Sequence, residues 1–350
     1  MAINKKVAIV IFNLGGPDKP EAIQPFLFNL FNDPAILMIP NPFRWILAKI
    51  ISILRAPESK KIYAKVGGKS TLLPETLSQA RAIKKNLSEY FNNFEIFIFM
   101  RYWKPSVSEV TKEIKEYDPD NIILMPLYPQ FSCTTSGTSI KAFKREAFRI
   151  GLKAPQDVLC CYPTNQEFIN ASVKNIKQGL DQAKAHGKPR LLLSAHGLPE
   201  KTIKSGDPYQ WQIEETSAAI VNTLGISNLD HVTCYQSRLG PIKWITPSTE
   251  EEIKRAGKDN VPVVIVPIAF VSEHVETLVE LDIEYRELSI AAGVPFFYRA
   301  PVVGTNPIFI EGLTNLIKTS FTGKESIISE IFIRKCPSHF SHCPNSYFKK

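Results

Sequence analysis

Four glutamates and a histidine lie in one short stretch of the chain, where they could bind a metal ion or move protons. The spacing is three, four and four residues between Glu273, Glu276, Glu280 and Glu284, with His274 among them. Side chains at such spacings stack on one face of a helix. Like charges placed there repel one another unless water or a cation screens them. The stripe is therefore either a solvated acidic face or one wall of a site.

The residues before the stripe favour a site. An apolar, β-branched run at 261–268 is bounded by prolines, which predicts a buried strand. Ser272 can then cap a helix whose first acidic residue is Glu273. Because open α/β sheets place their sites beyond the carboxyl ends of strands, the stripe begins where a site is expected.

A second histidine, His196, ends another apolar strand and is followed by the tight turn Gly197-Leu198-Pro199. A lone histidine is more often structural than catalytic, but at this end of a central strand its side chain points into the crevice. A neutral imidazole is also well matched to taking a proton near pH 7. We therefore pair His196 with Glu276, although neither residue has a zinc-site spacing such as HExxH.

Strand-like runs alternate with helical patterns along the chain, which is typical of parallel sheets covered by helices. The strands are predicted at 7–13, 94–100, 121–127, 190–195, 231–235, 261–268 and 295–299. The helices are predicted at 20–30, 74–91, 107–117, 139–150, 165–185, 210–224, 249–256 and 308–319. The two halves also resemble each other weakly. We therefore expect an α/β protein with two Rossmann-like lobes, each a parallel sheet flanked by helices, and an active-site cleft between them.

The predicted division of the chain has four parts. They are a first lobe at 1–160 with an apolar lip at 40–65, a second lobe at 161–305 carrying the metal site, a C-terminal helix at 306–325 packing on the first lobe, and a tail with cysteine and histidine at 326–350. The helix at 43–54 is apolar nearly all round. It is either a buried core helix or a lip that meets a membrane surface or a hydrophobic ligand.

Composition limits the location and the partners. A net charge of +8 suits an anionic partner, but no Lys/Arg cluster is dense enough to indicate nucleic acid. No stretch approaches the roughly 18 apolar residues of a membrane span. The two lysines and apolar run near the N-terminus lack a small-residue cleavage site, so a first strand is expected there. Six scattered cysteines suit a reducing cytoplasm.

Aromatic and hydrogen-bonding side chains follow two strands of the first half, in Arg101-Tyr102-Trp103 and in the stretch from Tyr128 to Ser132. Core packing is the alternative for each aromatic residue. Together with Phe270, they suit a flat, apolar, aromatic ligand.

With these residues considered, the sequence resembles the ferrochelatase family, which inserts ferrous iron into protoporphyrin to make protohaem. The matching stretches are NLGGP at 13–17, KVGGKSTL at 65–72, MRYWKP at 100–105, PLYPQFSCTTSG at 126–137, LSAHGLPE at 193–200, GDPY at 206–209, YQSRLGP at 235–241 and IAFVSEHVETLVELDIEY at 268–285. They occur in order and cover the chain to about residue 320, and the last stretch is specific without the others.

The resemblance implies roles for individual residues. His196 binds the metal and takes part in removing the pyrrole protons, Glu276 is the facing metal ligand, and Glu280 and Glu284 continue a path for protons or metal. The substrate-binding residues implied are Arg101, Tyr102, Ser70, Tyr128, Ser132, Phe270 and His274. The expected partners are protoporphyrin IX and ferrous iron. The apolar segment corresponds to an active-site lip that in some members meets the membrane, so peripheral contact with the cytoplasmic side of an inner membrane is also expected.

The tail departs from part of the family. Some members hold a [2Fe-2S] cluster with three tail cysteines and, in one branch, a cysteine at the position of Cys133. Here the tail supplies only Cys336 and Cys343. Four thiolates are the usual complement, so a cluster would need Cys133 and a further donor, a histidine or a cysteine at 160–161. The alternative is a disordered or zinc-binding tail.

The expected activity is that of a lyase, protoporphyrin ferrochelatase, which releases two protons in the last step of haem synthesis. One alternative is a non-catalytic tetrapyrrole or haem carrier that uses the same cleft and does not need the carboxylates. The other is a cobalt or nickel chelatase of a different tetrapyrrole, against which the lack of a His-rich tract argues.

Overall fold

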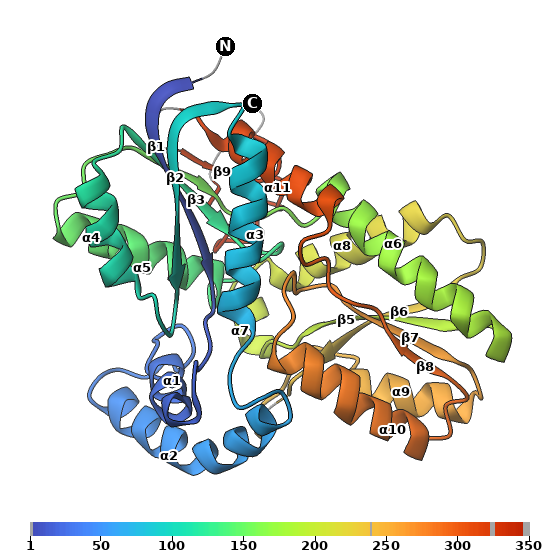
Figure 1. The fold of residues 1–350 in the computed structure, drawn as a ribbon. Coiled ribbons are helices and arrows are strands. Elements are labelled where there is room, and N and C mark those ends of the chain that lie inside the picture. The colour runs from blue at the N-terminus through green and yellow to red at the C-terminus, as the bar shows by residue number, and fades with distance from the viewer. Residues whose placement is uncertain (1–2, 239, 323–325, 346–350) are drawn as a thin grey trace. The chain divides into compact units, whose positions relative to one another are not determined.

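The computed structural model describes residues 3–238, 240–322 and 326–345, and it divides the chain into two compact units. The first unit comprises Met1–Leu127, Ser132–Cys160 and Thr314–Ile328, and the second comprises Tyr128–Phe131, Cys161–Leu313 and Ser329–Lys350. Each unit is built on its own parallel sheet (Figure 1). The expected α/β class with two parallel sheets is thereby confirmed. The cleft expected between two lobes stays a prediction.

The sheet of the first unit has the order β2-β1-β3-β4-β9, and all its neighbours are parallel. Its strands are β1 (Ile3–Asn13), β2 (Phe91–Met100), β3 (Asn121–Pro126), β4 (Gln156–Leu159) and β9 (Ser326–Ile328). Every residue of β1 from Val7 to Phe12 is completely buried. Such an unbroken apolar run forms a strand covered by helices on both faces, because no face is left for polar side chains.

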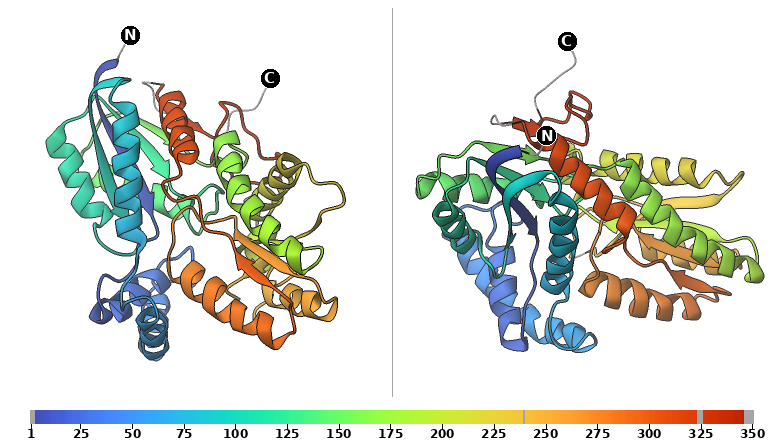
Figure 2. Two further views of the ribbon diagram at one scale, coloured as in Figure 1. Left: turned by 45° about the vertical axis from the view of Figure 1, so that its right-hand side comes forward. Right: turned by 45° about the horizontal axis from the view of Figure 1, so that its top comes forward.

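The helices of the first unit follow from right-handed crossovers between parallel strands, with α3 on one face of the sheet and α4 and α5 on the other (Figure 2). They are η1 (Pro20–Ala22), α1 (Ile23–Phe31), α2 (Phe43–Ala64), α3 (Leu72–Leu87), α4 (Val107–Tyr117) and α5 (Ser136–Arg149). α4 begins at a capping box, in which Ser106 and Glu109 each accept a hydrogen bond from the other's backbone N–H.

The sheet of the second unit has the order β6-β5-β7-β8 and is also parallel throughout. Its strands are β5 (Arg190–His196), β6 (Asp230–Gln236), β7 (Val263–Pro267) and β8 (Phe297–Arg299). The sheet lies between α6 and α8 on one face and α9 and α10 on the other (Figure 1). The helices are α6 (Gln166–Ala183), η2 (Lys184–His186), α7 (Glu200–Lys204), α8 (Tyr209–Leu224), α9 (Thr249–Lys258), a π-helix labelled η3 (Glu276–Glu284), α10 (Tyr285–Ala291) and α11 (Pro307–Ser320).

Two strands were not expected from the sequence. β4 has four residues and β9 has three, so neither is long enough to show a strand pattern. β9 pairs with β4 at the edge of the first sheet, so the first residues of the predicted tail are part of that sheet. α11 belongs to the second unit up to Leu313 and to the first unit from Thr314 onward.

Close packing between α9 and α10 depends on Gly257. A Cβ atom at this position would lie 2.0 Å from the carbonyl oxygen of Ala292, which is backbone and cannot rotate away. We expect Gly257→Ala to lower the free energy of unfolding by about 1–3 kcal/mol, because overpacking forces the two helices apart. Urea unfolding followed by circular dichroism measures the change. Lys254→Ala, on the exposed side of the same helix, is the control and should change little; equal stability of the two variants would contradict the packing.

Candidate functional site

The second sheet has a topological switch point between β5 and β7. The chain leaves β5 for β6 on one side and later continues from β7 to β8 on the other, so the loops after β5 and β7 diverge. His196 is the last residue of β5, and Ser194 of that strand is paired with Pro267, the last residue of β7. The stretch that leads to Glu276 follows β7 directly. The structure therefore brings the two sequence-predicted residues to the crevice where α/β sheets bind ligands.

The turn after His196 is held rigidly by its backbone. Gly197 donates its N–H to the carbonyl of Gln236 at 2.8 Å, and a Cβ atom on Gly197 would lie 2.9 Å from that same oxygen. The hydroxyl of Tyr209 donates to the carbonyl of His196 at 3.0 Å. Glycine is thus required at this position because β6 approaches too closely for a side chain. The imidazole consequently starts from a fixed backbone.

The acidic helix differs from the prediction. It was expected to begin at Glu273 under a cap from Ser272, but residues 276–284 form a π-helix with Val275 as the residue before it. The hydroxyl of Thr277 instead accepts the N–H of His274 at 3.0 Å, and it lies 2.5 Å from a carboxylate oxygen of Glu273. A π-helix bonds residue i to i+5, is rare, and is found mostly at functional sites. Periodicity of apolar residues does not distinguish it from an α-helix.

Glu273 does not belong to the stripe, so the prediction of four carboxylates on one helical face is wrong. Its carboxylate pairs with Arg299 at 2.5 Å and accepts the backbone N–H of Val302 at 3.2 Å. Glu273 precedes the helix and points to β8 and the residues after it. The charge of Glu273 is therefore neutralised by an arginine, which no helical spacing could reveal.

His196 and Glu276 are in direct contact. Nδ1 of the imidazole lies 2.9 Å from Oε2 of the carboxylate, and both side chains are partly exposed, at 36% and 26%. Burial alone would lower the pKa of His196, but the charges of Glu276 and Glu280 outweigh it and raise that pKa. Burial would raise the pKa of Glu276, but the two histidines outweigh it and lower that pKa. Each side chain thus shifts the pKa of the other in the direction that favours the charged form of both.

The same two atoms are suited to share a divalent ion. Metal bonds to imidazole nitrogen and carboxylate oxygen are about 2.0–2.2 Å long, so two ligands at right angles on one ion lie roughly 3 Å apart. The separation of 2.9 Å between His196 and Glu276 matches that value. Two protein ligands leave several positions on the ion open, which suits a metal that is passed on rather than retained.

Glu280 lies one step further along the π-helix and is held by hydrogen bonds from three residues. Ser237 donates its backbone N–H at 2.8 Å and its hydroxyl at 2.5 Å, the hydroxyl of Tyr285 donates at 2.9 Å, and the amide of Gln236 donates at 3.2 Å. Burial and the neighbouring charge of Glu276 nevertheless raise the pKa of Glu280. The pKa of Glu280 is thus shifted in the opposite direction to that of Glu276, which makes Glu280 the more readily protonated of the two.

Sequence reasoning did not identify the residues that hold Glu280. Ser237 has a φ of 62°, a left-handed conformation that costs a non-glycine residue roughly 1–3 kcal/mol and is concentrated at functional sites. This conformation directs both its N–H and its hydroxyl to one carboxylate. The only signal in the sequence was the position of Gln236 and Ser237 at the end of β6. Glu284, at the last residue of the π-helix, is half-buried, and its place on a proton or metal path stays a prediction.

Phe270 and His274 form an apolar wall beside the pair. Their rings lie 4.4 Å apart, and the ring of Phe270 lies 6.5 Å from that of His196. Burial is the main cause that lowers the pKa of His274, so its pKa is shifted in the opposite direction to that of His196. His274 is buried, and its Nδ1 has no hydrogen-bond partner among the described residues.

The other predicted substrate-binding residues lie in both units. Tyr128 lies in the second unit, while Arg101, Tyr102, Ser70 and Ser132 lie in the first. Ser132 is completely buried, and its hydroxyl bonds Thr134 in the turn before α5. The hydroxyl of Ser70 accepts the N–H of Leu72 at 3.2 Å. Direct contact of these side chains with a ligand stays a prediction.

Three cysteines of the second unit are close to Gln212 or to each other. The amide of Gln212 donates to Cys336 at 3.1 Å and to Cys161 at 3.5 Å, and the thiols of Cys336 and Cys343 share a hydrogen bond. That shared bond raises the pKa of Cys336 and lowers that of Cys343. None of the six cysteines forms a disulfide, and Cys133 lies in the first unit.

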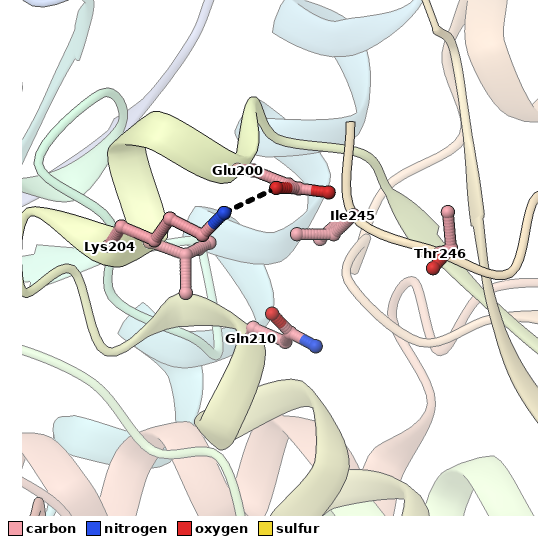
Figure 3. A pocket seen from close by; sticks show the side chains of 6 residues that line it. Glu200, Lys204, Gln210, Ile245 and Thr246 are labelled. Atoms are coloured by element: carbon pink, nitrogen blue, oxygen red, sulfur yellow. Dashed lines mark hydrogen bonds and ion pairs between the residues drawn. The ribbon is translucent and has the colours of Figure 1, made fainter. Parts of the chain in front are cut away.

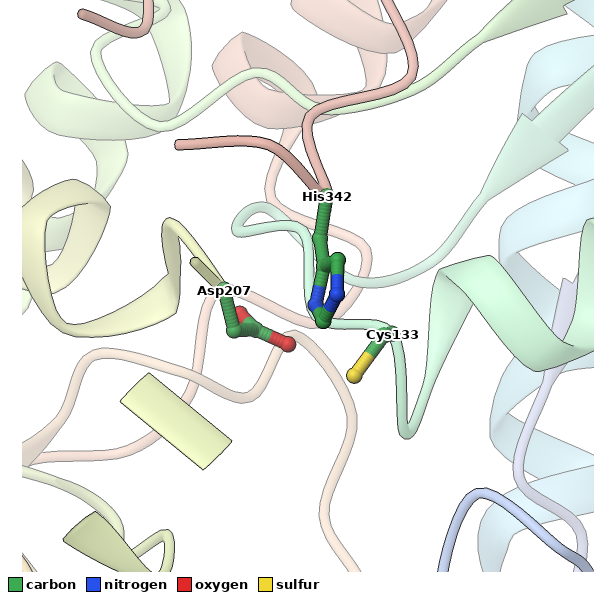
Figure 4. A group of neighbouring side chains, drawn as sticks. All are labelled: Cys133, Asp207 and His342. Atoms are coloured by element: carbon green, nitrogen blue, oxygen red, sulfur yellow. The ribbon is translucent and has the colours of Figure 1, made fainter. Parts of the chain in front are cut away.

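The tail packs on the turn at 206–209 within the second unit. The backbone N–H of His342 donates to the carbonyl of Gly206 at 3.1 Å, and the carboxylate of the neighbouring Asp207 accepts the N–H of Tyr209 at 2.9 Å. Figure 4 shows the side chains of Asp207 and His342. Trp211 contacts Phe340 with ring centroids 6.0 Å apart. A disordered tail is therefore wrong for residues 329–345, because they have defined contacts with α8 and the turn before it.

A pocket of about 300 Å³ opens next to α7 in the second unit (Figure 3). Its lining residues are Glu200, Ile203, Lys204, Gln210, Ile245 and Thr246. Glu200 and Lys204 form an ion pair across it at 2.6 Å. None of its lining residues is His196, Glu276 or Glu280.

Comparison with known proteins shows that the sequence is similar to ferrochelatases. The sequence profile of the family described as Ferrochelatase matches residues 6–321. The chain is 49% identical over 343 residues to the ferrochelatase of Pelagibacter ubique (strain HTCC1062), covering 97% of this chain and 98% of that protein. It is 50% identical over 348 residues to that of Rickettsia bellii (strain OSU 85-389), covering 98% and 96%.

Solved structures with a similar fold include SirB from Bacillus subtilis with Fe3+, with a TM-score of 0.56 and 15% identity over 91% of this chain and 96% of that one. A second is the sirohydrochlorin chelatase SirB from Bacillus subtilis subspecies spizizenii in complex with cobalt, with a TM-score of 0.53 and 13% identity over 90% and 95%. At these identities the likeness is one of fold, and the fold is the expected chelatase-like one.

The ion pair at the site can be tested by titration without metal. We expect the pKa of His196 to lie above 6.5, the usual value, and to fall in Glu276→Gln, because the stabilising carboxylate charge is lost. NMR of the imidazole resonances across pH measures both. Glu287→Gln, an exposed carboxylate on α10, is the control and should leave the curve unchanged.

The sign of the linked stability follows from the same shift. The pKa of His196 is higher in the folded protein than in the unfolded chain. Its contribution to the free energy of unfolding is therefore complete below the pKa of the unfolded chain, and it is lost as pH rises through the pKa of the folded protein. An identical titration midpoint in the wild type and in Glu276→Gln would show that the two side chains are not coupled in solution.

Proposed function

The chain belongs to the ferrochelatase family, and we propose that His196 and Glu276 form its metal-insertion site. Its activity is that family's lyase reaction, the insertion of ferrous iron into protoporphyrin IX in haem biosynthesis. This activity is therefore favoured over the two alternatives given above, a tetrapyrrole carrier and a cobalt or nickel chelatase. The observation that supports the site most strongly is the 2.9 Å contact between an imidazole nitrogen and a carboxylate oxygen at the switch point of the second sheet.

Metal entry and proton release are linked in this arrangement. The reaction exchanges one Fe²⁺ for the two N–H protons of the macrocycle, so two protons must leave the site in each turnover. The ion replaces the proton between His196 and Glu276, and it passes to the porphyrin nitrogens as those nitrogens lose their protons. His196 accepts one pyrrole proton as the ion leaves it, and the carboxylate of Glu280 accepts the other; both protons then pass to solvent. Glu276 stabilises the imidazolium that results.

Phe270 and His274, beside the pair, suit the macrocycle, and further residues are proposed to bind it. Phe270 is half-buried beside His196 and offers an apolar face to a porphyrin ring, and His274 lies against it. Arg101 binds a propionate through a charge-assisted hydrogen bond. Tyr128 is a further half-buried aromatic residue suited to the ring, whereas Ser70, Ser132 and Tyr102 support the site through the local contacts of their hydroxyl groups.

The cysteines of the second unit do not supply the four thiolates that an iron–sulfur cluster usually has. Within the second unit the thiols of Cys161 and Cys336 contact Gln212 and that of Cys343 contacts Cys336, which makes three thiol donors where four thiolates are usual. Cys133, the fourth candidate from the family pattern, belongs to the first unit. The donor set of the second unit alone is therefore one thiolate short.

The helix α2 is proposed as a contact with a membrane surface. Phe43, Trp45 and Leu54 are each at least half exposed, so the alternative of a buried core helix is wrong. Lys49 and Arg55 lie on the same helix and can contact anionic headgroups. No helix in the described ranges is both long enough and apolar enough to cross a membrane. We accordingly propose a protein of the cytoplasm that attaches peripherally to the cytoplasmic side of the inner membrane.

Catalysis depends most on His196. We expect His196→Ala to lower the rate of Zn²⁺ or Fe²⁺ insertion by at least about 100-fold, because a positioned general base contributes 10²–10⁴-fold and a metal ligand is lost as well. Glu276→Gln should be nearly as severe. Anaerobic assays of the metalloporphyrin absorbance measure both. His231→Ala, an exposed histidine of the same unit, is the control, and unchanged turnover in His196→Ala would overturn the mechanism.

Membrane attachment can be tested with vesicles. We expect Trp45→Ser combined with Leu54→Ser to reduce co-sedimentation with vesicles containing about one-third anionic lipid, because apolar area and cations act together in interfacial helices. Ile290→Ser, which removes an exposed apolar side chain from α10 in the second unit, is the matched control. Equal binding of the double variant and the wild type would contradict a role for α2.

A further inference from the structure

A buried carboxylate, Asp33, lies behind Arg101 in the first unit. Its side chain is only 1% exposed, and its Oδ2 is 2.5 Å from Nη2 of Arg101. The same oxygen accepts the hydroxyl of Thr138 at 2.7 Å and the hydroxyl of Tyr102 at 3.0 Å. The other oxygen accepts the backbone N–H of Ala35 at 2.8 Å. Asp33 is thus fully hydrogen-bonded, and none of these partners comes from solvent.

These contacts fix one edge of the guanidinium. Nε and Nη2 of Arg101 both contact the hydroxyl oxygen of Thr138, at 3.1 and 3.0 Å, and Nη2 also contacts Asp33. The plane of the group lies over the ring of Tyr102, with Cζ 4.8 Å from the ring centroid. The backbone is held too, because Arg101 donates its N–H to Asn13 at the end of β1. Only Nη1 makes no hydrogen bond within the described parts of the chain, and the side chain remains 18% exposed.

A flexible arginine would have to lose rotamer freedom on binding a ligand, whereas this one has already lost it. Long side chains are expensive to order at a binding site, and fixing them in advance improves affinity. A single free N–H edge also limits the ligand to one charge-assisted contact from this arginine rather than a two-point fork. The arrangement suits a carboxylate presented end-on by a larger molecule.

We propose that Asp33 is a positioning residue for substrate, which holds Arg101 so that its Nη1 edge meets one carboxylate of a porphyrin dicarboxylate. This proposal rests on the proposed function of Arg101. Asp33 itself does not touch the substrate, and its effect is therefore on binding and not on the metal-transfer step. Thr138 and Tyr102 contribute by completing the shell of donors around the same carboxylate.

The test compares protoporphyrin IX with its dimethyl ester, in which methylation removes both carboxylate charges and leaves the macrocycle unchanged, in the same detergent. Binding to the full-length protein is measured by titration of porphyrin fluorescence, and turnover is measured at saturating protoporphyrin IX. We expect Asp33→Asn to weaken binding of the dicarboxylate at least about 10-fold, the loss of a hydrogen bond to a charged group, and to leave the diester Kd and the saturating turnover unchanged. Glu95→Gln, which removes a carboxylate from an exposed pair with Lys84, is the matched control.

Two further variants distinguish the possible failures. Arg101→Met should weaken the dicarboxylate alone. If it does not, the proposed function of Arg101 fails and the proposal for Asp33 fails with it. Arg101→Met can weaken the dicarboxylate alone while Asp33→Asn changes neither ligand or weakens both equally. That result would overturn the positioning role of Asp33 and leave the proposed role of Arg101 in place. Thr138→Val retains the carboxylate and serves if Asp33→Asn does not fold: a selective loss of dicarboxylate affinity supports the proposal, and an equal loss for both ligands contradicts it.

Discussion

The contact between His196 and Glu276 is the interaction on which the rest of the site depends. It joins the end of β5 to the start of the π-helix after β7, so the two segments that diverge from the switch point are linked by one bond of 2.9 Å. Its strength comes from opposite charges in partly desolvated surroundings, where hydrogen bonds between ionised groups are stronger than neutral ones. Under the proposed function, an ion that replaces the shared proton would satisfy both side chains without a rearrangement of either segment.

The neighbouring carboxylates differ in their partners and in the direction of their pKa shifts. Three of the carboxylates before or in the π-helix each have a different partner: Arg299 neutralises Glu273, His196 pairs with Glu276, and Ser237 holds Glu280. Burial and the charge of Glu276 raise the pKa of Glu280, while histidine charges lower that of Glu276. Two carboxylates with pKa values shifted in opposite directions suit a ligand and a proton acceptor respectively.

The positions of His196 and Glu276 could be predicted from the sequence. Each follows or ends an apolar strand, and the carboxyl ends of parallel strands lie at the same edge of a sheet. The π-helix could not be predicted, since one extra residue per turn leaves no mark in composition. Ser237 was missed because its role depends on a left-handed backbone conformation, and Asp33 was missed because its partners are 68 to 105 residues away. The prediction of four carboxylates on one helical face was wrong for a related reason. The spacing of the glutamates does not reveal that Arg299 on β8 pairs with Glu273.

The central claim is that one ion binds to both His196 and Glu276. Crystals grown and soaked anaerobically with Fe²⁺, and measured on both sides of the iron absorption edge, locate that ion without any assumption about activity. The predicted result is an anomalous peak roughly 2.0–2.2 Å from an imidazole nitrogen of His196 and from a carboxylate oxygen of Glu276. A peak elsewhere, with the two side chains still hydrogen-bonded to each other, would contradict it.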